Sequence, residues 1–146
     1  MVVHRVAAVA LLLLTGSLPV QGGNGPSHSP IVPAQVDEES FAEGRSVFQR
    51  CQACHVVNDE QNRVGPHLVG LFGRQSGSVE GFRYSDVMVE AGIVWDDETL
   101  AAYLADPRGY LPGNRMAFPG LADEEALAAL LVYLREATAP PQEQAE

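Results

Sequence analysis

The sequence predicts an all-α fold with three main helices joined by long loops. Three segments, at about residues 40–51, 97–105 and 123–139, carry apolar side chains at the three- and four-residue spacing of a helix face. No segment shows the alternation of apolar and polar residues that indicates a half-buried strand. A chain of 146 residues with 46% hydrophobic residues has enough apolar material for one compact domain.

The first 22 residues are predicted to be an export signal. Met1–Arg5 forms a short basic start, and Val6–Leu14 forms an unbroken apolar run. Small residues at Thr15–Ser17 and Val20–Gly22 offer two cleavage positions, so we expect cleavage between residues 17 and 23. The alternative is an uncleaved membrane anchor, but a spanning helix needs about 20 apolar residues and this run has roughly half that number. The leader therefore indicates an exported, periplasmic bacterial protein.

Composition sets the boundaries of the remaining segments. Residues 23–38 are rich in glycine, proline and serine and have no apolar period, which predicts a flexible tether. The folded domain is expected at residues 39–138, and residues 139–146 are expected to form a disordered tail.

The charge of the chain excludes some classes of partner. Removal of Arg5 with the leader leaves eight arginines and no lysine against nineteen acids, a formal charge of −11. Because so acidic a protein repels other polyanions, nucleic acid and anionic membranes are excluded as partners.

The first helix is expected to begin at Ser40–Glu43, where a hydroxyl and an acid stand at the spacing of a capping box. One face of this helix is formed by Phe41, Gly44, Val47, Phe48 and Cys51. The helix would therefore bring Cys51 to its C-terminal end.

The strongest chemical signal is the motif Cys51-Gln52-Ala53-Cys54-His55. Two thiols at this spacing can each form a thioether with one vinyl group of the same porphyrin, while the following histidine binds its iron. We therefore predict one haem c per chain, attached through Cys51 and Cys54 and ligated by His55.

Three alternatives explain the cysteine pair less well. A zinc ribbon needs four ligands, usually from two cysteine pairs, and this chain has only two cysteines. A thioredoxin-type dithiol needs a βαβ setting that the sequence lacks. A disulfide between such close cysteines would close a very short loop and add little stability.

The long stretch of residues 56–94 is punctuated by glycines and is expected to be loop-like. So long a loop is unusual in one domain unless something other than protein, such as a planar cofactor, fills the core. The second helix is expected at Asp97–Ala105, capped by the acids of Asp96–Glu98 and stopped by Pro107.

Residues 110–120 are again irregular, and the last helix follows them. It is expected to begin near Asp123–Glu125 and to end before Pro140. Its apolar stripe consists of Leu127, Leu130, Leu131 and Leu134.

A carrier that does no bond chemistry needs a sixth iron ligand, for which the mature chain offers Met88, Met116, His28 and His67. His28 lies in the tether, His67 lies in a loop soon after His55, and Met88 lies in an apolar segment that favours burial. Met116 lies in a loop shaped by proline and glycine, where a thioether can be held at a fixed point. By elimination, Met116 is the predicted second ligand.

From Phe41 to Thr138 the chain carries a series of specific motifs. They are Gly44 and Phe48; Cys51, Cys54 and His55; Gly65-Pro66; Gly70-Leu71-Phe72-Gly73-Arg74; Gly81-Phe82-Arg83-Tyr84-Ser85-Asp86; Gly92-Ile93-Val94-Trp95; Tyr103-Leu104; Tyr110-Leu111-Pro112-Gly113; Met116; and Leu130 and Tyr133. This series resembles the class I c-type cytochromes, the group of mitochondrial cytochrome c and the soluble cytochromes of photosynthetic bacteria. The resemblance implies that group's fold, with three main helices and long loops wrapped around one covalent haem.

The resemblance also assigns roles to residues around the haem. The carbonyl of Pro66 would accept a hydrogen bond from the His55 ring and so raise the basicity of this ligand. Arg74, Tyr84 and Trp95 would bind the buried inner propionate, whose charge Arg74 would neutralise. The alternative for the aromatic residues is simple core packing.

Two further roles concern the distal ligand and the helix crossing. Tyr103 would contact the sulfur of Met116 from the core side. Gly44 would let the first helix cross the last one closely, near Leu130 and Tyr133.

Two positions depart from the pattern of the group. Met88 stands where asparagine is common, and Asn114 replaces the usual hydroxyl beside the ligand loop. Both positions normally help to order a buried water, so we expect the network on the methionine side to be rearranged.

The function implied by the resemblance is that of a diffusible, monomeric single-electron carrier and not an enzyme. Its partners would be larger electron donors and acceptors, such as a cytochrome bc1-type complex, an oxidase, a reaction centre or a dehydrogenase. The alternative is a membrane-tethered subunit of a redox complex, and an enzyme or gas sensor would need a labile sixth ligand.

A docking face is predicted where the group carries lysines around the exposed haem edge. The arginines at these positions are Arg50, Arg63, Arg108 and Arg115. Such a basic face on an acidic body would orient encounters with a partner. The alternative is that these are scattered surface arginines.

Overall fold

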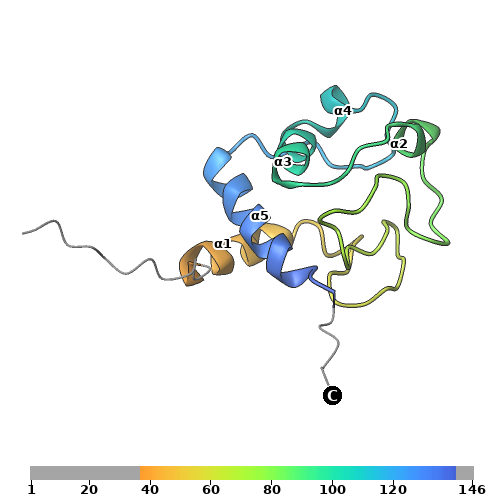
Figure 1. Cartoon of the computed structure of the whole chain (residues 1–146). Helices are drawn as coiled ribbons and strands as arrows, with labels where there is room; N and C mark the ends of the chain where they lie inside the picture. Colours follow the sequence, from red (N-terminus) through yellow and green to blue (C-terminus); the bar gives the residue numbers. More distant parts are fainter. Residues whose placement is uncertain (1–36, 141–146) are drawn as a thin grey trace, which may run out of the picture. The chain divides into compact units, whose positions relative to one another are not determined.

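The computed structural model describes residues 37–140, so the predicted export signal, most of the tether and most of the tail lie outside the described residues. The described residues form five helices (Figure 1). They are α1 (Glu38–Phe48), α2 (Asp86–Glu90), α3 (Asp97–Ala105), α4 (Pro107–Tyr110) and α5 (Glu124–Ala137). Within residues 37–140 the only β pairing is an isolated antiparallel bridge between Gln75 and Val94. The all-α prediction is confirmed.

Helix α1 begins earlier than the sequence predicted. Its N-cap is Asp37, whose carboxylate accepts hydrogen bonds from the Glu39 amide at 3.4 Å and the Ser40 hydroxyl at 2.8 Å. The predicted capping box at Ser40 is therefore wrong, because an acid three residues upstream caps the first turn and takes up that hydroxyl. The helix starts at Glu38, one residue before the expected domain boundary at 39.

Helices α3 and α5 occupy the segments predicted for them, whereas α2 and α4 were not predicted. A capping box between Asp96 and Thr99 starts α3. Pro107 ends α3 as expected, but it is also the first residue of α4, a position where a missing amide hydrogen costs nothing. Helix α2 is a single short turn inside the glycine-rich stretch, too short to give a detectable period.

Helices α1 and α5 pack directly against each other and cross at Gly44 (Figure 1). A Cβ atom on Gly44 would overlap the carbonyl oxygen of Ala129 and lie 2.7 Å from Cβ of Tyr133. The rings of Phe41 and Phe48 each lie 5.3 Å from the Tyr133 ring. The close crossing that the resemblance implied for Gly44 is therefore present, with Ala129 as its main contact.

The core joins these helices to the loops. Its buried members are Phe48, Leu71, Met88, Trp95, Leu100, Tyr103, Leu121, Leu130, Tyr133 and Leu134. Because they come from α1, α2, α3, α5 and the intervening loops, one core supports the whole described domain. Among residues 37–140, no helix has the length and apolar character needed to cross a membrane.

Candidate functional site

The two cysteines lie in a tight turn that continues directly from α1. The amides of Cys54 and His55 both donate to the carbonyl of Cys51, at 2.9 and 3.0 Å. Both thiols are free and half-buried. Burial raises the pKa of the Cys51 thiol, an effect that the charge of Arg50 partly offsets. Both sulfurs are thus held as unpaired thiols on one turn, which is the arrangement that two thioether bonds require.

The imidazole of His55 is held in one orientation. Its Nδ1 lies 2.8 Å from the carbonyl oxygen of Pro66, and because a carbonyl only accepts, Nδ1 carries the hydrogen. Burial lowers the pKa of His55, the Pro66 bond raises it, and the charge of Arg74 lowers it again. The ring is therefore a neutral imidazole whose Nε2 lone pair is available to a metal.

One face of the His55 ring rests against Gly65. A Cβ atom on Gly65 would lie 2.8 Å from both ring nitrogens and closer still to Cε1. The Gly65 amide donates to the Cys54 carbonyl at 3.0 Å, and its carbonyl accepts from the Arg63 amide at 2.9 Å. The Gly65-Pro66 pair thus supplies both a flat surface and a hydrogen-bond acceptor for the histidine.

Arg74 is a half-buried cation bonded to backbone carbonyls. Its guanidinium donates to the carbonyls of Val69 at 2.8 Å and His67 at 3.1 Å, and burial lowers its pKa. Among residues 37–140 the structure gives it no carboxylate partner. Burial raises the pKa of the Tyr84 hydroxyl, and the positive charge of Arg74 partly offsets this shift. A half-buried cation in this setting fits an anionic group supplied from outside the chain, such as a propionate.

Tyr103 meets Met116 as the resemblance implied. The Tyr103 hydroxyl lies 3.8 Å from Sδ of Met116, and burial raises the pKa of this hydroxyl to about 12. The Trp95 ring packs 5.2 Å from the Tyr103 ring, so Trp95 lies in the core beside Tyr103. Met116 itself is half-buried in its loop.

The other candidate ligands have different surroundings. Met88 is only 8% exposed and belongs to the core cluster on α2. His67 has its amide bonded to Asn62 at 3.2 Å, and its buried Nδ1 has no hydrogen-bond partner among the described residues. His28 lies outside the described residues.

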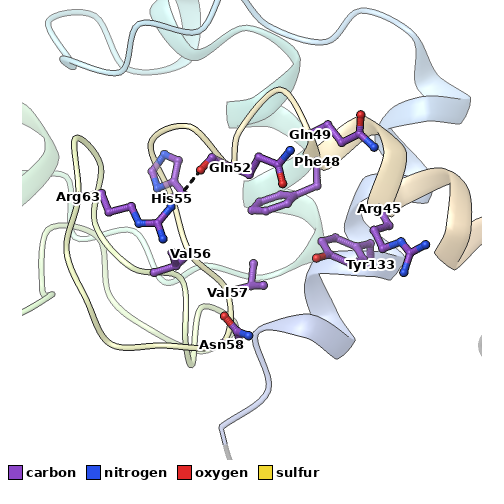
Figure 2. Close-up of a pocket in the computed structure, with 10 residues that line it drawn as sticks. All are labelled: Arg45, Phe48, Gln49, Gln52, His55, Val56, Val57, Asn58, Arg63 and Tyr133. Carbon is purple, nitrogen blue, oxygen red and sulfur yellow. Dashed lines mark hydrogen bonds between the residues drawn. The ribbon is translucent and has the colours of Figure 1, made fainter.

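An open cavity of about 640 Å³ is lined in part by His55 (Figure 2). It lies between the end of α1 and the loop of residues 55–63, with Phe48 and Val57 between Arg45 and Arg63. Arg63 donates to the Gln52 carbonyl at 3.4 Å. Neither Met116 nor Tyr103 lines this cavity, so it is distinct from the distal side of the site.

The donor set fits an iron porphyrin better than a bare metal ion. Two free thiols, a neutral imidazole and a thioether match two covalent attachments and two axial ligands. Within the part of the chain that the structure describes, no group of three or more histidine, cysteine or acidic side chains could hold a metal ion.

Sequence reasoning missed how two residues support the site. Gly65 is required by its contact with the His55 ring. Asn114, noted only as a departure, makes several hydrogen bonds around Met116. These contacts depend on loop positions that no periodicity encodes.

Comparisons with known proteins agree on one family. The profile of the family described as cytochrome c matches residues 41–138. The chain is 45% identical over 94 residues to cytochrome c2 iso-2 of Magnetospirillum fulvum, covering 64% of this chain and 98% of that protein. It is 40% identical over 107 residues to cytochrome c2 of Blastochloris viridis, covering 73% of this chain and 83% of that protein. The structure of cytochrome cH from Methylobacterium extorquens matches with a TM-score of 0.62 and 37% identity, over 66% of this chain and 97% of that one.

Proposed function

This chain belongs to the cytochrome c family, and from that premise we propose that it is an exported single-electron carrier with His55 and Met116 as the axial ligands of its haem. Family membership establishes the coarser function, a carrier of electrons between redox proteins with covalent haem c. The spacing of Cys51 and Cys54 provides the attachment.

The hydrogen bond from His55 to Pro66 is the observation that carries the proposed ligation. It fixes the tautomer and leaves Nε2 as the only ring donor for iron. The contact between the Tyr103 hydroxyl and the Met116 sulfur supports the thioether as the second ligand. Methionine opposite histidine raises the reduction potential relative to other haem ligations.

Other residues of the chain would hold the haem and exclude water from it. When bound, the haem supplies a one-electron couple at its iron. Cys51 and Cys54 would hold it covalently, Arg74 would neutralise a propionate, and the buried rings of Trp95 and Tyr103 would exclude water. With His55 and Met116 both bound, the iron would keep no vacant position for a substrate, which favours a carrier over an enzyme or gas sensor.

The proposed docking face consists of Arg50, Arg63, Arg108 and Arg115. All four side chains are exposed, which is what a contact with a partner requires. The partners would be a cytochrome bc1-type complex, an oxidase, a reaction centre or a dehydrogenase in the periplasm. The second candidate function, a membrane-tethered subunit, would keep the leader with its apolar run Val6–Leu14 as the anchor, and N-terminal sequencing of the mature protein distinguishes it from the first.

Absorption spectroscopy tests the ligation directly. The oxidised protein should show the weak long-wavelength iron–thioether band, and Met116→Ala should abolish it. Survival of the band in that variant would move the ligand to Met88, and a wild-type protein without the band would favour His67. A pigment that acidified acetone extracts would contradict covalent attachment.

A further inference from the structure

The loop that carries Met116 is tied together by one side chain, Asn114. Its Nδ2 donates to the carbonyls of Pro107 at 2.7 Å and Leu111 at 2.8 Å. Its Oδ1 accepts the backbone N–H of Met116 at 3.0 Å. One carboxamide therefore links the start, the middle and the end of the segment of residues 107–116.

The orientation of this carboxamide follows from its neighbours. Two carbonyl oxygens need a donor and one amide hydrogen needs an acceptor, so only this orientation satisfies all three. The Tyr103 hydroxyl also lies 3.4 Å from Oδ1, closer than the 3.8 Å to the Met116 sulfur. An amide oxygen accepts a hydrogen bond more strongly than a thioether does, so Asn114 competes with the Met116 sulfur for the single hydroxyl proton of Tyr103.

We propose that Asn114 is the positioning residue of the distal ligand, which holds the Met116 backbone so that the thioether stays on the iron. The inference rests on the proposed ligation by Met116 and adds a residue outside the ligand set. Pro112 and Gly113 shape the turn, but proline has an apolar side chain and glycine has none, so neither residue offers a side-chain acceptor to the Met116 amide. Without the carboxamide, the loop would lose the bonds that join its two ends.

Ligand exchange in the oxidised protein measures this restraint. Added imidazole replaces the Met116 sulfur on the iron, one donor atom for another with no electron transferred, and at high imidazole the departure of the thioether limits the rate. Asn114→Leu keeps the number and branching of the side-chain heavy atoms and removes every side-chain hydrogen bond of Asn114. We expect it to accelerate the exchange about tenfold, equivalent to about 1.4 kcal/mol. Asn114→Ser, which places a hydroxyl where the carboxamide was, should exchange at a rate between those of the wild type and the leucine variant, and it serves if the leucine variant does not fold.

A matched control separates positioning from general destabilisation. Asn62 is also half-buried and joins two loops, with Nδ2 donating to the Glu80 carbonyl at 2.9 Å and Oδ1 accepting the His67 amide at 3.2 Å. Asn62→Leu removes a comparable bridge away from the methionine, and we expect its exchange rate to stay within about twofold of the wild type.

The outcomes are distinguishable. Equal acceleration in the variants of Asn62 and Asn114, or no acceleration in either variant of Asn114, would overturn the positioning role while leaving the ligation intact. If the wild type lacks the iron–thioether band and Met116→Ala exchanges at the wild-type rate, the ligation fails and the positioning role fails with it.

Discussion

Replacing Gly65 by alanine should displace the ring of His55, the proposed haem ligand, while His55 itself stays unchanged. The added Cβ would lie 2.8 Å from Nδ1 and Nε2 of the His55 ring. Gly65 cannot retreat easily, because its amide is bonded to Cys54 and its carbonyl to the Arg63 amide. The ring must therefore move, and its 2.8 Å hydrogen bond to Pro66 lengthens or breaks.

Two contributions set the size of the effect. Overpacking a well-packed site costs about 1–3 kcal/mol, and the lost hydrogen bond adds about 1 kcal/mol. Together they lower the free energy of unfolding by about 3 kcal/mol. For a domain of about 100 residues, this corresponds to a fall in Tm of roughly 12–24 °C. A weaker bond at Nδ1 also makes the imidazole less basic, so the reduction potential should rise.

Thermal unfolding followed by circular dichroism, together with a redox titration of the same sample, measures both effects. Val64→Ala is the matched control, because the adjacent Val64 side chain is 80% exposed and its truncation should change neither quantity. If Gly65→Ala unfolds within about 2 °C of the wild type and keeps its potential, the ring is not confined between Gly65 and Pro66, and the reasoning is refuted.

Three further perturbations have defined outcomes. Gly44→Ala should lower the free energy of unfolding by about 2 kcal/mol, because its Cβ overlaps the backbone of α5. Ser46→Ala, on the exposed side of α1, should not lower the free energy of unfolding. Equal Tm values for Gly44→Ala and Ser46→Ala would exclude the clash. Hydrogen bonds to Thr99 lower the pKa of Asp96 below 3.8, so its contribution to stability is present above the unfolded-state pKa and is lost as the pH falls through the folded-state pKa. Asp96→Asn keeps the cap but not this titration, so the wild-type Tm should fall toward that of the variant in acid, and a pH-independent difference would contradict it. Arg108→Glu should slow electron transfer to a physiological partner most strongly at low salt, and an unchanged salt dependence would remove this residue from the docking face.

The sequence predicted the helices that carry strong signals. Helix α3 has acids before it and a proline after it, and its bounds match the prediction. The start of α1 was misplaced because two capping sequences overlap there, and Asp37 precedes Ser40. Helices α2 and α4 have five and four residues, so neither is long enough to produce a period.

The groups proposed to attach and bind the haem were more predictable from the sequence than the residues that hold those groups in place. The two thiols and His55 are adjacent in the sequence, so their spacing alone points to haem. The hydrogen bonds of Asn114 and the contact of Gly65 with the ring form between loops, and loop conformation depends on the whole fold. For that reason the sequence identified Asn114 as a departure from the pattern of the group but did not predict its hydrogen bonds.

The crossing of α1 and α5 at Gly44 has a consequence for how the chain folds. It joins positions 44 and 129, so the two ends of the domain must meet before either helix has its partner. Contacts between such distant positions carry the entropic cost of closing a long loop, which slows folding. Until α5 is in place, α1 lacks the one helix against which it packs among residues 37–140, and the turn of residues 49–55 that follows α1 lacks that support as well.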